Sequence, residues 1–166
     1  WPEDLAHIEG RGCLPGADPE HVSARAMERG MEQLGTLGSG NHYLEIQVVR
    51  PGAIHDERAA RILGVDGPGQ IFVMLHCGSR GFGHQICDDF LKVMGQAMRK
   101  YDIRLPDRQL ACAPVESPEG RAYLAAMACG ANFAWANRQT IQHLAEQAFM
   151  EGMDCGVADV GLRSYA

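Results

Sequence analysis

A strand, a glycine-rich turn and an amphipathic helix follow one another directly in residues 70–100, and this order restricts the fold most. Residues 70–75 are apolar from Ile71 onward, which predicts a strand buried on both faces. The run leads into the glycine-rich turn of residues 76–85. Apolar side chains then recur at helical spacing in residues 86–100, on a stripe of Ile86, Phe90, Val93, Met94 and Ala97. These elements predict an α+β fold, with mixed sheets and flanking helices.

The same plan occurs earlier in the chain, where a glycine-rich loop at residues 35–40 precedes another strand. Asn41 and His42 lie where this loop enters the strand. Side chains of this strand alternate between two faces, with Tyr43, Glu45 and Gln47 on one and Leu44, Ile46 and Val48 on the other. After the strand, a short helix is predicted over residues 55–63.

Two pairs of residues are typical of helix starts, because an aspartate or serine N-cap stands directly before a proline. Asp18-Pro19 predicts a helix over residues 19–29, which Gly30 ends. Ser117-Pro118 predicts a long helix that extends to about residue 150, with one break near Gly130.

Composition and charge restrict the class of function. Of the residues, 46% are hydrophobic and 22% are charged, which is typical of a globular domain and excludes a disordered tail. The net charge of −6 excludes a general electrostatic attraction to nucleic acid but allows a local cationic pocket. No apolar run is long enough to predict a membrane span. The six cysteines include no C-x-x-C pair, which predicts reduced, mostly buried thiols in a cytoplasmic protein.

The turn at residues 76–85 has the features of an anion site. Its glycines let a ligand approach the backbone, and successive N–H groups of such a loop can bind an anion. Arg80 adds a planar fork that suits phosphate, and a helix that begins near Gln85 points its N-terminus at the same loop. The turn therefore predicts a phosphate or carboxylate site beside His76.

His42 and His76 both lie at strand edges beside glycine-rich turns, which makes them candidate metal ligands. Two histidines do not complete a site, so further ligands would be required. Cys77 is not expected to be a ligand, because neighbours at a strand edge point to opposite faces. A purely structural role for both histidines is the alternative. The remaining polar groups are assigned structural positions: His84 as a helix cap, Asp88 and Asp89 near a helix start, and His7, His21, His55 and His143 at the surface.

Several segments, in order along nearly the whole chain, resemble the RtcB family of RNA-splicing and RNA-repair ligases. The two longest are Leu34-Gly-Thr-Leu-Gly-Ser-Gly-Asn-His-Tyr-Leu-Glu-Ile-Gln47 and His76-Cys-Gly-Ser-Arg-Gly-Phe-Gly-His-Gln85. The others are residues 11–18, 107–112, 117–120 and 131–138.

The resemblance implies a ligase that joins RNA ending in a 3′-phosphate or a 2′,3′-cyclic phosphate to a 5′-hydroxyl end, such as tRNA halves or broken RNA. It also implies GTP and two Mn²⁺ ions, with a guanylylated histidine that passes GMP to the RNA 3′-phosphate. By position, His42 would ligate one manganese ion and His76 the other. Arg80 and Asn41 would bind the RNA phosphate. The GMP site would be lined by Asn41, His42, Tyr43, Leu44 and Glu45.

The chain also departs from the family pattern. The aspartate and bridging cysteine of the family's metal site are expected upstream of Trp1, and the third metal histidine and the guanylylated histidine downstream of Ala166. Cys77 stands where the family usually has serine. Residues 1–166 are therefore expected to be the central portion of a single RtcB-like catalytic domain, without a catalytic nucleophile and inactive alone. Two alternatives are a non-catalytic nucleotide- or RNA-binding remnant and a metal-dependent phosphatase-like hydrolase.

Overall fold

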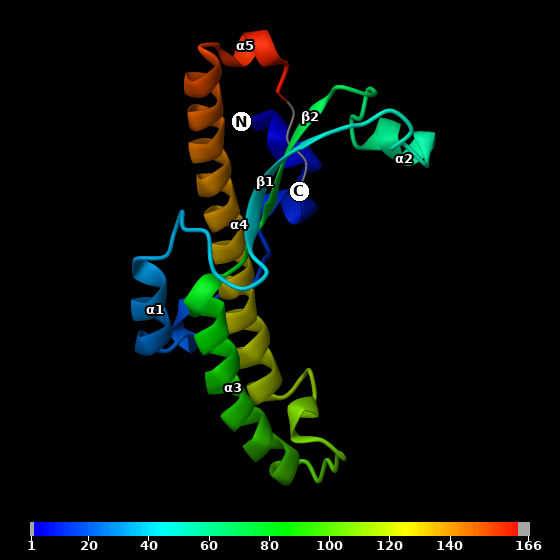
Figure 1. Ribbon diagram of the computed structural model, residues 1–166. Coiled ribbons are helices and arrows are strands. Elements are labelled where there is room, and N and C mark those ends of the chain that lie inside the picture. Colours follow the sequence, from blue (N-terminus) through cyan, green and yellow to red (C-terminus); the bar gives the residue numbers. More distant parts are fainter. Residues whose placement is uncertain (1, 163–166) are drawn as a thin grey trace. The chain divides into compact units, whose positions relative to one another are not determined.

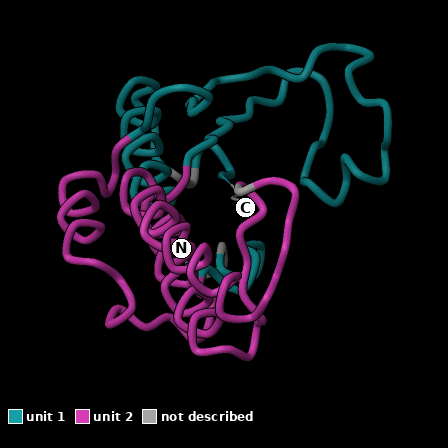
Figure 2. The backbone as a smooth tube through the Cα atoms, turned by 90° about the horizontal axis from the view of Figure 1, so that it is seen from below, with its two compact units in different colours: residues 1–12, 37–77, 138–166 teal, residues 13–36, 78–137 magenta. Residues whose placement is uncertain are grey.

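The structure is a computed structural model that describes residues 2–162, and the chain divides into two compact units (Figures 1 and 2). Helices occur together with a small antiparallel sheet, which agrees with the predicted mixture of α and β structure. Unit 1 comprises Trp1–Gly12, Leu37–Cys77 and Arg138–Ala166, and unit 2 comprises Cys13–Thr36 and Gly78–Asn137.

Unit 1 is built around a β-hairpin. Strand β1 (Tyr43–Val48) pairs antiparallel with β2 (Ile71–His76), and Tyr43 lies opposite His76 in the register. Both strands were predicted, since period-two alternation and a short apolar run are strong local signals. The connection between them carries the short helix α2 (Glu57–Ile62). Unit 1 also contains the 3-10 helices η1 (Pro2–His7) and η2 (Glu9–Gly12) and the helix α5 (Val157–Val160).

The prediction that the apolar run of β2 is buried on both faces is wrong. Ile71, Val73 and Met74 are 51%, 44% and 43% exposed. Within the described residues the sheet has only these two strands, so its central positions lack the neighbours that a larger sheet provides.

Unit 2 has a helical core. Helix α3 (Arg80–Lys100) lies alongside the first part of α4 (Pro118–Met153), whose residues from Arg138 onward belong to unit 1 (Figure 1). The shorter α1 (Ala24–Met31) packs on α3. The predicted stripe of α3 is confirmed, because Ile86, Phe90 and Met94 enter the core cluster, Val93 packs against it and Ala97 is buried. The other members of the cluster are Val22, Ala26 and Ala126.

Two helix boundaries in unit 2 differ from the prediction. Asp18 does cap a helix beginning at Pro19, but this is the 3-10 turn η3 (Pro19–His21). Ser23 caps α1, since its hydroxyl accepts a hydrogen bond from the N–H of Ala26 at 3.1 Å. A serine N-cap therefore restarts the chain as an α-helix after the proline-led turn.

Neither Gly30 nor Gly130 ends or breaks a helix. Gly30 lies inside α1, where an added Cβ would come within 3.1 Å of the Phe82 side chain. Helix α4 runs unbroken through Gly130, where an added Cβ would make ordinary van der Waals contacts with Gly83 and Ile86 of α3 at 3.7 and 3.8 Å. Gly30 therefore allows close helix packing, and this use of glycine has no signature in the local sequence.

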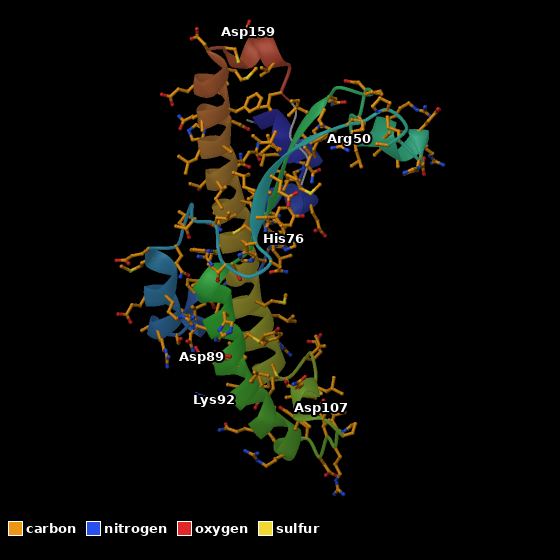
Figure 3. All side chains as sticks on the ribbon, viewed as in Figure 1. Arg50, His76, Asp89, Lys92, Asp107 and Asp159 are labelled. Atoms are coloured by element: carbon orange, nitrogen blue, oxygen red, sulfur yellow. The ribbon has the colours of Figure 1, made fainter. Side chains whose placement is uncertain are left out.

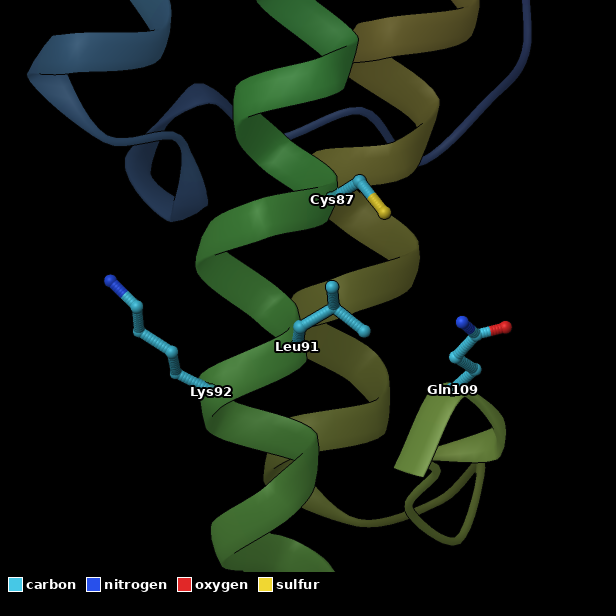
Figure 4. A pocket seen from close by; sticks show the side chains of 4 residues that line it. All are labelled: Cys87, Leu91, Lys92 and Gln109. Carbon is cyan, nitrogen blue, oxygen red and sulfur yellow. The ribbon is translucent and has the colours of Figure 1, made fainter. Parts of the chain in front are cut away.

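The loop between α3 and α4 contains the 3-10 helix η4 (Arg108–Leu110) and borders a hollow of about 650 Å³ (Figure 4). Cys87, Leu91 and Lys92 of α3 line this hollow together with Gln109. It contains none of the residues assigned to a site from the sequence. No described helix combines the length and the apolar character needed to cross a bilayer.

The cysteines are free thiols, as predicted, but most are not buried. Cys77 is the buried member of the six, whereas Cys13 and Cys87 are exposed. Cys129 is partly buried, and burial raises the pKa of its thiol.

Candidate functional site

The hairpin of unit 1 brings two predicted site residues together. His42 immediately precedes β1 and His76 ends β2, so both lie at the end of the hairpin opposite its connecting loop (Figure 3 labels His76). Their ring centroids are 6.0 Å apart with an interplanar angle of 39°. The ring of Tyr43 stacks on His76 at 5.4 Å. Strand register alone therefore pairs two histidines that are distant in sequence.

Cys77 also belongs to this group of side chains. Its Sγ lies 3.8 Å from Nδ1 of His42, and its carbonyl oxygen accepts a hydrogen bond from Nη1 of Arg138 at 3.2 Å. The alternation rule does not reveal the contact with His42, because β2 ends at His76 and the strand geometry stops there. His76 is exposed, whereas Cys77 is buried.

The histidine pair fits part of a metal centre. Imidazole nitrogen is a good ligand for a divalent transition ion, and two rings this close can serve neighbouring ions. Among the side chains that the structure describes, however, no group of three or more His, Cys, Asp and Glu is arranged to hold a metal ion.

The five consecutive residues assigned to the GMP site begin before β1 and continue into it. Tyr43 and Glu45 project from one face of the strand and Leu44 from the other, because strand side chains alternate. Tyr43 donates its hydroxyl to the sulfur of Met74 at 3.3 Å, and Glu45 accepts a hydrogen bond from Gln47 at 2.8 Å. A ligand on one face of the hairpin would therefore meet only part of this set.

Arg80 belongs to unit 2, where it begins α3 in the left-handed conformation with φ of 53°. Its Nε donates to the carbonyl oxygen of Thr36 at 3.2 Å and to the Thr36 hydroxyl at 3.3 Å. The helix thus starts at the arginine rather than near Gln85. One backbone group expected to face an anion is used internally, because the N–H of Gly81 donates to the Gln33 side chain at 2.7 Å.

Asn137 of α4 joins the parts of the two glycine-rich segments that belong to unit 2, and the sequence did not point to it. Its Oδ1 accepts hydrogen bonds from the N–H groups of Gly35 at 2.7 Å and Thr36 at 3.2 Å. Its Nδ2 donates to the carbonyl oxygens of Thr36 at 3.3 Å and Gly78 at 3.1 Å. The side chain is fully buried. An amide in the middle of a long helix was the available signal, since such a group is buried only when it is hydrogen-bonded.

Asp89 is a structural residue, although not for the reason predicted. It lies well inside α3, so the expected role near a helix start is wrong. Its carboxylate accepts hydrogen bonds from the Ser23 hydroxyl at 2.6 Å and from Gln85 at 2.9 Å. The bond from Ser23 is the main cause that lowers the pKa of Asp89. This bond links the N-cap of α1 to α3.

The other histidines lie at the surface, as predicted for four of them. The predicted role of His84 as a helix cap is wrong, because His84 lies inside α3. It is also exposed, and its Nδ1 lies 3.4 Å from the carboxylate of Asp88 one helical turn later. The exposed set comprises His7, His21, His55, His84 and His143.

Comparison with known proteins agrees with the resemblance seen in the motifs. The family model described as tRNA-splicing ligase RtcB matches residues 1–164. A tRNA-splicing ligase RtcB from Methanocaldococcus jannaschii is 56% identical over 151 residues, covering 91% of this chain and 15% of the relative. The corresponding protein of Archaeoglobus fulgidus is 52% identical over 162 residues, covering 98% of this chain and 33% of the relative. The chain therefore spans about a third or less of the length of these relatives.

Proposed function

This chain belongs to the RtcB family, and on that premise we propose that it is the central portion of the single catalytic domain of an RNA ligase. The proposed reaction joins RNA with a 3′-phosphate or 2′,3′-cyclic phosphate end to RNA with a 5′-hydroxyl end, with GTP, in the cytoplasm. The substrates would be tRNA halves or broken RNA, and relatives named tRNA-splicing ligase support the first of these. The observation that carries the proposal is the 6.0 Å approach of His42 and His76.

His42 and His76 would each ligate one of two Mn²⁺ ions. Catalytic metal pairs lie about 4 Å apart and metal–nitrogen bonds are about 2 Å long, so the observed ring separation suits one histidine on each ion. When bound, such ions neutralise and polarise phosphate oxygens. The upstream Asp and Cys and the downstream histidine of the family pattern would complete the coordination.

Arg80 would bind the RNA 3′-phosphate together with Asn41. Thr36 engages Nε of Arg80, which orients the guanidinium plane and presents its terminal amino groups as the fork that suits a phosphate. The GMP moiety of GTP would occupy the segment Asn41–Glu45. These residues bind and orient the reacting groups, and the guanylylated histidine would come from the downstream part of the domain.

The test is a ligation assay with RNA that carries a 2′,3′-cyclic phosphate, a 5′-hydroxyl RNA, GTP and Mn²⁺. The full-length protein that contains this chain should ligate, and residues 1–166 alone should not. His42→Ala and His76→Ala should each abolish ligation, whereas His55→Ala, an exposed histidine on the hairpin connection, should have no effect.

Three results would contradict the proposal and would differ from one another. Ligation by residues 1–166 alone would place the nucleophile inside this chain. Release of phosphate from small esters without ligation would favour the hydrolase alternative. Binding of GMP or RNA without guanylylation of the full-length protein would favour the non-catalytic remnant.

A further inference from the structure

Asn137 is the one fully buried large side chain of the described residues, and four of its hydrogen bonds reach main-chain groups of the two glycine-rich segments. The partners are Gly35 and Thr36 of the first segment and Gly78 of the second. A primary amide has two donors and a carbonyl oxygen that accepts twice, so these bonds satisfy the whole group. No smaller side chain can supply the same set.

The bonds of Asn137 and Arg80 meet at one atom. The carbonyl oxygen of Thr36 accepts from Nδ2 of Asn137 at 3.3 Å and from Nε of Arg80 at 3.2 Å. The position of that oxygen therefore depends on Asn137, and the orientation of the guanidinium depends on that oxygen. A chain of two hydrogen bonds connects the buried amide to the arginine.

The backbone of the second segment gives an independent argument. Arg80 has a φ of 53°, a conformation that a non-glycine residue rarely adopts. Such a conformation persists only where neighbouring contacts determine it. Asn137 binds the carbonyl of Gly78, two residues before Arg80, and Gln33 binds the N–H of Gly81, one residue after it. The strained residue is thus held on both sides.

We propose that Asn137 is a positioning residue for the RNA 3′-phosphate, which fixes the guanidinium of Arg80 through the Thr36 carbonyl and the Gly78 carbonyl. The inference rests on the proposed function, because it takes Arg80 as the group that contacts the phosphate. It extends that function to a residue which itself touches no substrate.

Asn132 provides a matched control on the same helix. Its Oδ1 accepts from the N–H of Leu14 at 2.7 Å, and its Nδ2 donates to the Leu14 carbonyl at 3.1 Å. Asn132 therefore also binds the main chain, but its bonds do not involve the glycine-rich segments. The Asn132 variant shows what the loss of a purely structural asparagine in α4 does to phosphate preference.

The test measures the affinity of the full-length protein for one RNA oligonucleotide with either a 3′-phosphate or a 3′-hydroxyl end, by fluorescence anisotropy without GTP. The unaltered protein should prefer the phosphate. Asn137→Ser should lower that preference about tenfold, which corresponds to about 1.4 kcal/mol. Asn137→Asp keeps the size and the acceptor but loses the donors to Thr36 and Gly78, and it should have the same effect. Asn132→Ser should leave the preference unchanged.

A double-mutant cycle separates positioning from general destabilisation. In an Arg80→Ala background, Asn137→Ser should cause no further loss of phosphate preference, because its effect acts through the arginine. The inference is overturned if either folded Asn137 variant keeps the full preference, if Asn132→Ser loses it equally, or if the two losses are additive. An unaltered protein without any preference would instead overturn the phosphate role of Arg80, and the inference with it.

Discussion

Replacement of Asn137 by alanine is expected to loosen the glycine-rich segments of unit 2 by an amount that the structure allows us to estimate. The variant removes four hydrogen bonds, each with a net contribution of about 0.5–1.5 kcal/mol. Gly35, Thr36 and Gly78 are half-buried, so water can reach some of the freed groups. We therefore expect a loss of about 3 kcal/mol, in the lower half of the summed range of about 2–6 kcal/mol. Asn132→Ala removes two bonds and should cost about 1–2 kcal/mol.

Amide hydrogen exchange is the suitable assay, because it reports local opening at single residues. A loss of about 3 kcal/mol should speed exchange at the Gly35 amide by about 100-fold in Asn137→Ala. The Leu14 amide should exchange at its normal rate in this variant. Asn132→Ala should give the reverse pattern, with fast exchange at Leu14 and normal exchange at Gly35. Unchanged protection of Gly35 in Asn137→Ala would refute the reasoning that the buried amide holds this segment.

Two further predictions concern the start of α4. Lys100 donates to Glu119 at 2.8 Å, and this bond is the main cause that lowers the pKa of Glu119 from 4.5 to about 2. Because the folded-state pKa is depressed, the contribution to stability is present above the unfolded pKa and is lost as the pH falls toward about 2. Urea midpoints of the protein and of Glu119→Gln should therefore differ at neutral pH and converge in acid, and a constant difference would contradict this. Gly120→Ala should destabilise the protein by about 2 kcal/mol in urea unfolding, because the added Cβ would lie 2.7 Å from the carbonyl oxygen of Val115. Gly95→Ala has open space and should be neutral or stabilising, so an equal loss in both variants would show that crowding is not the cause.

The predictable parts of the fold are those determined by local pattern. Alternation identified β1, and the apolar stripe of α3 identified the core face of that helix. Burial of β2 was predicted wrongly. An apolar run shows that a strand can be buried, but it does not show whether other described elements pack on its two faces. Gly30 and Gly130 were interpreted as helix ends or breaks, since the partner helix that approaches each glycine is distant in sequence.

The candidate site was predictable to a similar extent. Histidines beside glycine-rich turns drew attention to His42 and His76, and the structure brings their rings together. The role of Asn137 could not be predicted from the sequence, because it depends on three main-chain partners that are far away in sequence. The start of α3 at Arg80 was also missed, since a residue with positive φ at a helix start has no pattern to predict it.

The central claim is that His42 and His76 each bind one ion of a manganese pair. Electron paramagnetic resonance of Mn²⁺ titrated into the full-length protein tests it most directly, because the signal of the free hexaaquo ion falls as the ion binds. The account predicts two bound ions per chain, one in His42→Ala, one in His76→Ala, and two in the exposed-histidine control His55→Ala. Two ions retained in both site variants would contradict the claim, and would leave the histidine pair as a structural feature of the hairpin.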